Sequence, residues 1–253
     1  MIQKFVKNML ATSGFKLVKV EQQVYGQPVP NELEPEFLAL YEKCRPFTMT
    51  TLERMYSAYK AATYVAQHQI PGAIVECGVW KGGSSMMMAL ALLQKGVQDR
   101  DVYLFDTFEG MPEPGEKDQD LKGTSAYGTW QEGQTDQVNT WCYSPLEEVQ
   151  QNLISTGYPK EKIHFIKGKV EDTIPKTIPS AIALLRLDTD WYDSTYHELV
   201  HLYPLLSQRG VLIIDDYGHW QGAREATDQY FVENKVAMLL NRIDYTGRIG
   251  IKI

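Results

Sequence analysis

The chain is poor in cysteine and carries no excess of basic residues. Its 253 residues include three cysteines, Cys44, Cys77 and Cys142, and no Cys-x-x-Cys pair. Because this number is odd and the spacings are wide, neither a disulfide framework nor a cysteine zinc site is indicated. Lysine and arginine number 25 against 32 aspartates and glutamates, a net charge of −7. That balance argues against nucleic acid or an anionic membrane as the main partner.

Long apolar runs are also missing. No stretch approaches the ~18 consecutive apolar residues of a membrane-spanning helix. Residues 1–20 carry four lysines among their apolar residues and lack both the apolar core and the small-residue cleavage pattern of a secretory signal. We therefore expect a cytoplasmic protein in a reducing compartment.

Five short apolar runs of strand length are spread along the chain. They are continuous rather than alternating, which is typical of parallel strands buried on both faces. The runs are Ala73–Cys77, Val102–Asp106, Ile163–Gly168, Ile182–Asp188 and Val211–Asp216. Helical patterns lie between or after them at 84–93, 145–155, 195–206 and 223–232. The alternation predicts βαβ units and hence a doubly wound, mostly parallel α/β sheet.

Three further segments lie outside this alternation. Residues 236–243 and 248–253 have strand character and predict a closing antiparallel hairpin. Residues 1–45 predict a helical extension that packs on the sheet or on a partner chain, which favours a homo-oligomer, and residues 46–253 then form one domain of ordinary size. Residues 109–145 are polar, glycine-rich and aromatic. A loop this long is usually a lid or binding loop, and a disordered insertion is the alternative.

Carboxylates gather where the apolar runs end. They are Glu76, Asp106, Asp188, Asp190, Asp215 and Asp216. In an open parallel sheet, ligands bind outside the carboxyl ends of the strands. A single aspartate at such a place often caps the next helix instead, but that explanation weakens when most of the junctions carry acids.

The segment Glu76–Ser85 follows a strand, contains Gly78, Gly82 and Gly83, and enters a helix. Glycines let a ligand approach the backbone, and the helix start offers free N–H donors. The spacing is neither the dinucleotide G-x-G-x-x-G nor a phosphate P-loop. Asp106 ends the next strand, where an acid can accept hydrogen bonds from ribose hydroxyls. Together these features indicate a cofactor that contains adenosine.

Asp188-Thr-Asp190 and Asp215-Asp216 end two strands that we expect to be neighbours. Carboxylates converging there would repel one another unless a cation neutralised them. Because these are hard oxygen ligands without a nearby cysteine or histidine, they point to Mg²⁺, with Mn²⁺ or Ca²⁺ as alternatives.

A set of spaced motifs over residues 45–235 resembles one family, the macrocin/mycinamicin/novobiocin (TylF-like) sugar O-methyltransferases. The motifs are Glu76–Ser85, Asp106-Thr-Phe-Glu-Gly-Met-Pro112, Gly168-Lys-Val-Glu-Asp172, Leu187-Asp-Thr-Asp-Trp-Tyr-Asp-Ser194 and Ile214-Asp-Asp-Tyr-Gly218. The resemblance implies an enzyme that uses S-adenosylmethionine and Mg²⁺, with the seven-stranded, Rossmann-like class I methyltransferase sheet. The acceptor it implies is a hydroxyl of a sugar or another small molecule with a diol, in natural-product tailoring.

The resemblance also implies roles for single residues. Asp190 would be the general base, and Asp188, Asp215 and Asp216 would bind the metal. The cofactor would be bound by Thr48, Met49, Glu76, Gly78, Gly82, Ser84, Ser85, Asp106, Gly168, Val170 and Asp188. Residues 1–44 and the predicted lid carry no such match, so they are expected to decide the acceptor.

Other interpretations of the same residues remain open. Asp188-Thr-Asp190 also resembles the D-x-D of nucleotide-sugar glycosyltransferases, although the glycine turn and Asp215-Asp216 are then unexplained. His197-Glu-Leu-Val-His201 matches the zinc-protease pattern, with Glu225 as a conceivable third ligand. On a helix these histidines face away from the apolar stripe, which favours a solvated face. A catalytically inactive cofactor-binding domain is disfavoured because all the acids are present.

A few single residues have a structural and a functional interpretation. Arg186 lies within an apolar run, so we expect a structural ion pair. Cys77 is expected to be a small core residue. Trp191 and Tyr192 suit either the acceptor wall or core packing, and His219 is expected to be structural rather than to touch substrate.

Overall fold

The structure is a computed structural model that describes residues 23–24, 27–28, 30 and 32–253. The chain divides into a unit of residues 1–38 and a unit of residues 39–253. The first unit contains strand β1 (Gln23–Val24) paired antiparallel with β2 (Gln27–Pro28), and the first residues of helix α2 (Pro35–Cys44). The predicted helical extension at 1–45 falls largely outside the described residues and stays a prediction.

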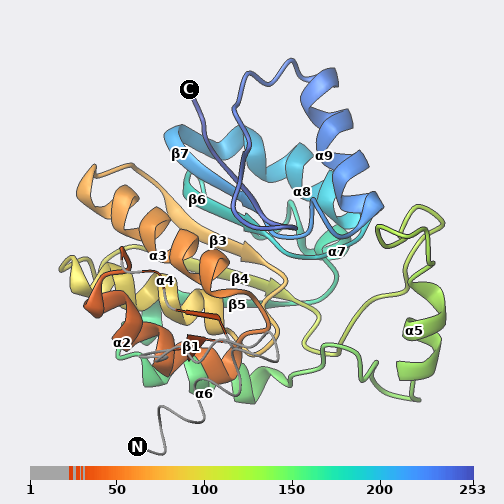
Figure 1. The fold of residues 1–253 in the computed structure, drawn as a ribbon, viewed down its shortest axis with the longest axis horizontal. Coiled ribbons are helices and arrows are strands. Elements are labelled where there is room, and N and C mark those ends of the chain that lie inside the picture. Colours follow the sequence, from red (N-terminus) through yellow and green to blue (C-terminus); the bar gives the residue numbers. More distant parts are fainter. Residues whose placement is uncertain (1–22, 25–26, 29, 31) are drawn as a thin grey trace, which may run out of the picture. The chain divides into compact units, whose positions relative to one another are not determined.

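A seven-stranded sheet forms the centre of the second unit, in the order β5-β4-β3-β6-β7-β9-β8 (Figure 1). The strands are β3 (Ala73–Cys77), β4 (Val102–Asp106), β5 (Ile163–Lys167), β6 (Ile182–Leu187), β7 (Leu206–Ile214), β8 (Asn241–Arg242) and β9 (Arg248–Ile251). The first five are parallel, whereas β9 runs antiparallel to β7 and β8 antiparallel to β9. This confirms the mostly parallel α/β sheet with its C-terminal antiparallel hairpin.

The strand order reverses between β3 and β6. The chain builds outward from β3 through β4 to β5, then returns to the other side of β3 with β6 and β7. In sheets of this kind the point of reversal leaves a crevice at the carboxyl ends of the two flanking strands. Every residue of β3 and β6 is buried, which explains why both read as continuous runs in the sequence.

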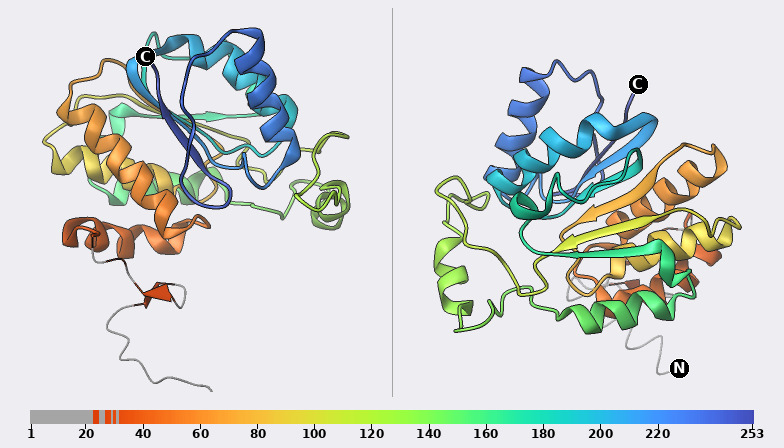
Figure 2. Two further views of the ribbon diagram at one scale, coloured as in Figure 1. Left: turned by 45° about the horizontal axis from the view of Figure 1, so that its top comes forward. Right: turned by 180° about the vertical axis from the view of Figure 1, so that it is seen from behind.

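Helices flank the sheet in two groups (Figure 2). Helices α3 (Leu52–Gln67), α4 (Gly83–Gln94) and α6 (Leu146–Ser155) pack in series, as do α7 (Val170–Thr173), α8 (Tyr192–Leu202) and α9 (Gln221–Glu233). Short 3₁₀ turns occupy Arg45–Phe47, Lys160–Lys162 and Tyr203–Leu205. None of the described helices combines the length and the apolar character needed to cross a bilayer.

Two predicted boundaries on either side of residue 206 are wrong. The helix predicted for 195–206 ends at Leu202, because Pro204 lacks the N–H that a continuing helix needs. Strand β7 then begins at Leu206, five residues before the predicted start, and ends at Ile214. Asp215 and Asp216 therefore follow the strand rather than belong to it.

The strand predicted for 236–243 is also wrong over most of its length, since only Asn241–Arg242 pairs with β9. Val236, Met238 and Leu240 pack against the core and alternate with the exposed Ala237 and Leu239, so every second side chain points inward, as it would in a strand. Met238 lies against Gly250 of β9 through its side chain. The segment therefore covers the hairpin with side chains and does not extend its hydrogen-bond ladder.

The segment predicted as a lid contains helix α5 (Tyr127–Gly133). In Figure 1 it lies on the side of the sheet to which the arrowheads of β3 and β4 point. It is therefore at the edge where the acids gather.

Candidate active site

A cavity of about 420 Å³ lies at the carboxyl ends of the parallel strands. Its wall includes most of the residues that the sequence singled out: Thr48, Met49, Gly78, Ser84, Asp106, Gly168, Val170, Asp188, Asp190, Asp215 and Asp216. Three predicted cofactor residues, Glu76, Gly82 and Ser85, lie outside this lining. Segments far apart in the chain thus meet at one site, at the crevice that the strand order creates.

The turn after β3 depends on glycine. Gly78 has a φ of +80°, and a Cβ atom there would lie 2.0 Å from the carbonyl oxygen of Asp188. Any side chain at this position would therefore push the turn away from the end of β6. Helix α4 follows with Gly82 before its first residue, so its free N–H groups open beside the cavity.

Asp106 fixes this turn from the neighbouring strand. Its Oδ2 accepts the backbone N–H groups of Val79 at 2.7 Å and Trp80 at 3.1 Å. Its Oδ1 accepts the N–H of Phe108 at 2.7 Å. Burial raises the pKa of Asp106, and these three hydrogen bonds oppose the shift. The Thr107 hydroxyl also donates to Oδ1, at 3.4 Å. Asp106 thus orders the turn at the cavity that it lines.

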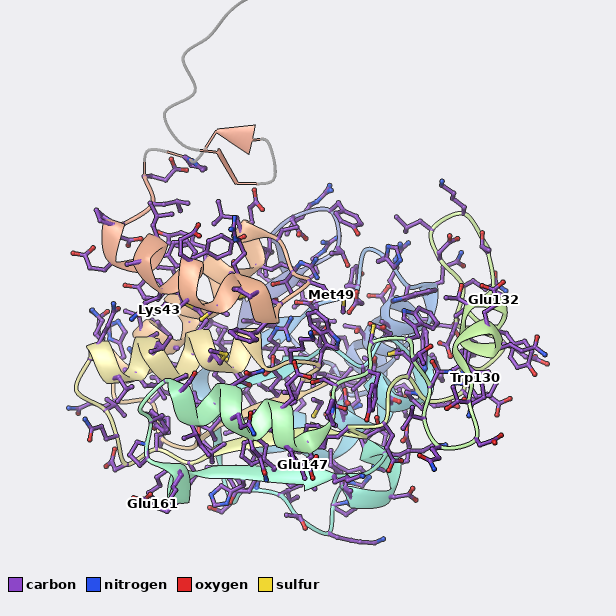
Figure 3. The ribbon with its side chains drawn as sticks, turned by 90° about the horizontal axis from the view of Figure 1, so that it is seen from below. Lys43, Met49, Trp130, Glu132, Glu147 and Glu161 are labelled. Atoms are coloured by element: carbon purple, nitrogen blue, oxygen red, sulfur yellow. The ribbon has the colours of Figure 1, made fainter. Side chains whose placement is uncertain are left out.

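The cavity is covered on another side by the segment before α3. The Thr48 and Thr50 hydroxyls are 2.9 Å apart, and Thr48 also accepts the N–H of Thr50. Gly83 lets this segment approach, because a Cβ atom there would lie 2.5 Å from the carbonyl oxygen of Phe47. Met49 is 58% exposed and is labelled in Figure 3. An exposed apolar side chain at a cavity mouth suits a cover over a ligand.

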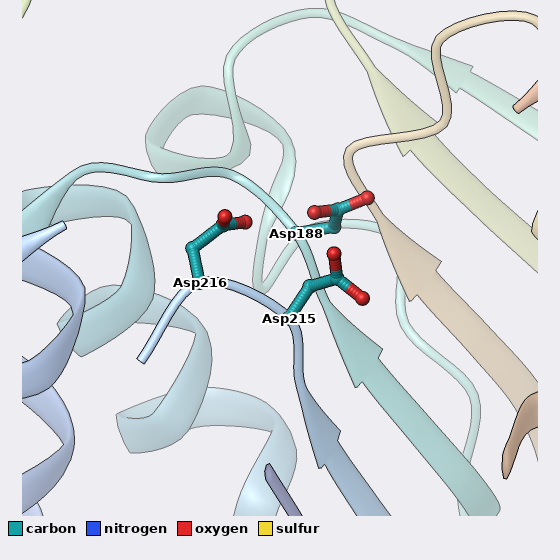
Figure 4. A group of neighbouring side chains, drawn as sticks. All are labelled: Asp188, Asp215 and Asp216. Atoms are coloured by element: carbon teal, nitrogen blue, oxygen red, sulfur yellow. The ribbon is translucent and has the colours of Figure 1, made fainter. Parts of the chain in front are cut away.

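Asp188, Asp215 and Asp216 converge at the ends of β6 and β7 (Figure 4). One carboxylate oxygen from each lies within 4.8 Å of the others. Oδ2 of Asp216 is buried and has no hydrogen-bond partner among the residues that the structure describes. An unpartnered oxygen in a set of three hard donors fits a divalent cation such as Mg²⁺.

Two arginines neutralise part of this acidic cluster. Arg186 lies inside β6, and its guanidinium contacts Glu76 at 2.5 Å, Asp188 at 2.8 Å and Asp215 at 2.6 Å. The expected structural ion pair of Arg186 is confirmed. Its partner Glu76 also accepts a hydrogen bond from the Ser85 hydroxyl. Arg54, on α3, pairs with Asp215 from the other side. No sequence motif marked Arg54, because it lies 161 residues from its partner.

Asp190 has the properties of a proton acceptor at neutral pH. Its backbone has a φ of +69°, in the left-handed region that aspartate adopts more readily than most non-glycine residues. Desolvation raises the pKa of Asp190 to about 7, and the charges of Asp188 and Asp215 add to the shift. A carboxylate with this pKa is a better base than one at its ordinary value of ~3.9.

Tryptophans form the wall of the cavity beyond the acids. Trp141 and Trp220 line it. Trp191 packs behind them, with ring centroids 5.7 Å and 5.1 Å from theirs. Trp191 is 2% exposed and donates its indole N–H to the carbonyl of Pro112. Of the two interpretations of Trp191, core packing is therefore confirmed. The sequence pointed to Trp191 and missed Trp220, which lies with Asp216 in the loop between β7 and α9.

The histidines show no metal site. His219 lines the cavity with its ring edge-on to Trp220 at 4.8 Å. The rings of His197 and His201 lie in tilted contact with their centroids 4.4 Å apart, and Nε2 of His197 is hydrogen-bonded to the carbonyl of Ile174. Among the described residues, the acidic cluster at 188, 215 and 216 is the group with metal-ligating geometry. Both histidines are half-buried, so the face that was predicted to be solvated is only partly exposed.

Comparison with known proteins points to one enzyme family. A family model described as Macrocin-O-methyltransferase (TylF) matches residues 42–249. The chain is 31% identical over 243 residues to the 8-demethyl-8-(2,3-dimethoxy-alpha-L-rhamnosyl)-tetracenomycin-C 4'-O-methyltransferase of Streptomyces olivaceus, covering 96% of this chain and 88% of that protein. It is 32% identical over 200 residues to the demethyldecarbamoylnovobiocin O-methyltransferase of Streptomyces niveus, covering 79% and 73% of the two chains.

The fold agrees with a solved structure as well. The O-methyltransferase NovP superposes with a TM-score of 0.71 at 28% identity, covering 98% of this chain and 97% of that one. The match extends over nearly the whole of both chains, so the sheet with its hairpin is that of an O-methyltransferase.

Proposed function

The chain belongs to the macrocin O-methyltransferase (TylF) family, and we propose that it transfers a methyl group from S-adenosylmethionine to a hydroxyl of a glycoside, assisted by Mg²⁺. The observation that carries this proposal is the single cavity that joins a glycine turn, a three-carboxylate cluster and an aromatic wall. A cofactor site and a metal site side by side are what a metal-assisted methyl transfer requires.

The cofactor would lie along the carboxyl ends of β3 and β4. The turn at Gly78, the start of α4 at Ser84 and the carboxylate of Asp106 supply the polar groups there. Gly168 and Val170 would border the adenine, and Thr48 and Met49 would cover the ligand. Glu76 and Ser85 would act from behind this lining, because the Ser85 hydroxyl donates to Glu76 and Glu76 pairs with Arg186. Gly82 would act through the turn that leads into α4.

Asp188, Asp215 and Asp216 would hold the divalent cation through carboxylate oxygens. The bound groups together supply an electrophilic sulfonium methyl and a Lewis acid that polarises the acceptor hydroxyl. Arg186 holds Asp188 and Asp215 in place at 2.8 Å and 2.6 Å, so the ligand oxygens are ordered before a ligand arrives. Such preorganisation is how a site lowers a barrier without moving at the moment of reaction.

Asp190 would remove the acceptor proton. An alcohol is a poor nucleophile at neutral pH, so a base must take the proton as the oxygen attacks. Asp190 lines the same cavity as the metal acids and has a pKa of about 7. Because this pKa is close to neutral pH, Asp190 can accept the proton that the acceptor hydroxyl loses.

The acceptor would be a neutral glycoside. The described basic residues on the cavity wall are Arg54, Lys169 and Arg186, and both arginines are already paired with acids. Little unpaired positive charge is therefore left near Trp141 and Trp220 to bind the diphosphate of a nucleotide sugar. The two tryptophan rings suit the apolar face of a sugar or its aglycone instead. The names of the two relatives above, which act on glycosylated natural products, support the same class.

The glycosyltransferase alternative is less well supported. It uses Asp188 and Asp190 but gives no role to the glycine turn or to Asp216, and the fold and family matches are methyltransferases. No observation favours a second function over methyl transfer.

Calorimetry with the purified chain separates the two donors. We expect S-adenosylmethionine to bind and UDP-glucose to give no heat, with or without Mg²⁺. Asp188→Ala should abolish Mg²⁺ binding, because it removes one of three ligands, while the exposed Glu161→Gln should leave it unchanged. Binding of UDP-glucose in preference to S-adenosylmethionine would reject the proposal.

A further inference from the structure

Arg54 sits between two acids on different elements. Its Nη1 pairs with Oδ2 of Asp215, and its Nε contacts Oδ2 of Asp244 at 3.1 Å. Asp244 follows β8, and its Oδ1 accepts the N–H groups of Thr246 and Gly247 at 2.9 Å and 2.7 Å. Its side chain is therefore fixed by the turn and offers Arg54 a second, permanent anchor.

Asp215 has guanidinium partners on both of its oxygens. Arg186 takes Oδ1 at 2.6 Å, and Arg54 takes Oδ2. A cation bound by Asp188, Asp215 and Asp216 would share these oxygens and lie within a few ångströms of the Arg54 charge. Because like charges at that distance repel strongly away from bulk water, Arg54 and a divalent cation oppose each other at Asp215.

The two arginines differ in how firmly they are held. Arg186 is on a central strand, 3% exposed, and is paired with three acids. Arg54 is on a helix, 11% exposed, and lines the cavity, and it keeps Asp244 when Asp215 is given up. Of the two arginines, Arg54 is therefore the one that can release Asp215.

We propose that Arg54 is an internal counter-ion that competes with the divalent cation for Asp215 and so sets the metal affinity of the site. It neutralises the cluster in the metal-free protein and withdraws to Asp244 when the metal binds. This inference rests on the proposed metal site, and it assigns Arg54 a positioning role rather than a contact with substrate.

Metal affinity measured by calorimetry tests the competition directly, without turnover. Arg54→Gln removes the charge, so its affinity for Mg²⁺ should increase by about tenfold or more. Arg54→Lys keeps the charge and should stay near wild type. Arg209→Gln makes the same charge change at the far end of β7, where the side chain is exposed, and should also stay near wild type.

Thermal melting gives a second readout on the same proteins. Arg54→Gln should melt below wild type without metal, because Asp215 and Asp244 each lose one charged partner, and should gain more from added Mg²⁺. Unchanged or weaker Mg²⁺ affinity in a folded Arg54→Gln variant overturns the inference while leaving the metal site intact. Absence of Mg²⁺ binding in wild type and Arg54→Gln alike overturns the metal site and this inference together.

The wild-type protein provides a test should Arg54→Gln not fold. The Nε–H signal of Arg54, identified by its loss in Arg54→Lys, can be followed by NMR during a Mg²⁺ titration. We expect it to shift in step with metal binding. A signal that does not move at saturating Mg²⁺ contradicts the proposed withdrawal.

Discussion

Glu198 is a buried carboxyl group behind the loop that carries Asp188 and Asp190. It is 0% exposed, and its Oε2 accepts the hydroxyl of Thr189 at 3.2 Å. Its Oε1 has no hydrogen-bond partner among the described residues. Burial raises the pKa of Glu198 well above its ordinary value. Glu198 is the glutamate of the sequence His197-Glu-Leu-Val-His201. It is buried, whereas both histidines are half-buried, and the three side chains do not form zinc-protease geometry.

The raised pKa of Glu198 predicts how stability changes with pH. The unfolded chain releases this proton near pH ~4.3, whereas the folded chain keeps it to higher pH. Folding therefore binds a proton in that window, and the contribution of Glu198 to stability is full below pH ~4.3 and is lost as pH rises, by about 1.4 kcal/mol per pH unit. Glu198→Gln carries no proton to lose, so it should become more stable than wild type as pH increases.

Urea unfolding at a series of pH values measures this difference. The two free-energy curves should diverge above pH ~4.3 until pH passes the raised folded-state pKa of Glu198, with the glutamine variant gaining stability relative to wild type. Glu161→Gln makes the same change at an exposed acid and serves as the control. Parallel curves for wild type and Glu198→Gln would show that Glu198 is ionised in the folded protein.

The residues that the sequence revealed are those that end strands. Asp188, Asp215 and Asp216 could be predicted to converge, because parallel strands bring their carboxyl ends to one edge. The cations that balance them could not all be predicted. Arg186 interrupts an apolar run and was visible, whereas Arg54 lies on a helix far away in sequence and meets Asp215 only through tertiary packing.

At the scale of elements, the segment 109–145 is anchored rather than free. Asp118 is 2% exposed and accepts the N–H of Tyr192 at the start of α8 at 2.8 Å and that of Gly115 at 2.7 Å. Lys117 pairs with Glu225 of α9 at 2.6 Å. Figure 3 labels Trp130 on α5, which the same segment carries. We propose that this segment is a lid held by the first turns of two helices.

Loosening this anchor should affect acceptor binding more than folding. Asp118→Ala removes a helix-capping acceptor, worth about 0.5–2 kcal/mol, and frees the segment from α8. We expect a higher KM for the acceptor and faster proteolytic cleavage within 109–145. Asp136→Ala, an exposed acid of the same segment, is the matched control. Equal KM values and equal cleavage rates for the two variants would reject the lid.

Elements were predicted well where they are continuous apolar runs with clear ends, and poorly where a proline or side-chain packing decides where the element ends. Strands β3 and β4 have the predicted bounds, because both are short, mostly apolar runs, with glycines on either side of β3 and aspartates at the two ends of β4. The tail at 236–240 was misassigned, since alternating side chains that cover a hairpin look like a strand in the sequence. The helix predicted for 195–206 runs past Pro204, where the missing N–H ends the helix although the apolar pattern continues.

At the scale of the molecule, the strand order explains why one edge carries the chemistry. The reversal between β3 and β6 brings the glycine turn of one strand against the acids of the other, with Gly78 in contact with the backbone of Asp188. Part of the net charge of −7 is thus concentrated at one cavity. The acceptor could not be predicted as closely, because its wall comes from an irregular segment whose shape no periodic pattern encodes. The homo-oligomer and the cytoplasmic location stay predictions.

The central claim is that this cavity performs metal-assisted methyl transfer with Asp190 as the base. The most direct measurement follows the labelled methyl group of S-adenosylmethionine into glycosides with a free vicinal diol. We expect transfer by wild type that stops with a chelator and returns with Mg²⁺, and a loss of about 10²–10⁴-fold in turnover for Asp190→Asn with Mg²⁺ affinity retained. Full turnover by Asp190→Asn, or transfer that persists undiminished in the chelator, would contradict the account.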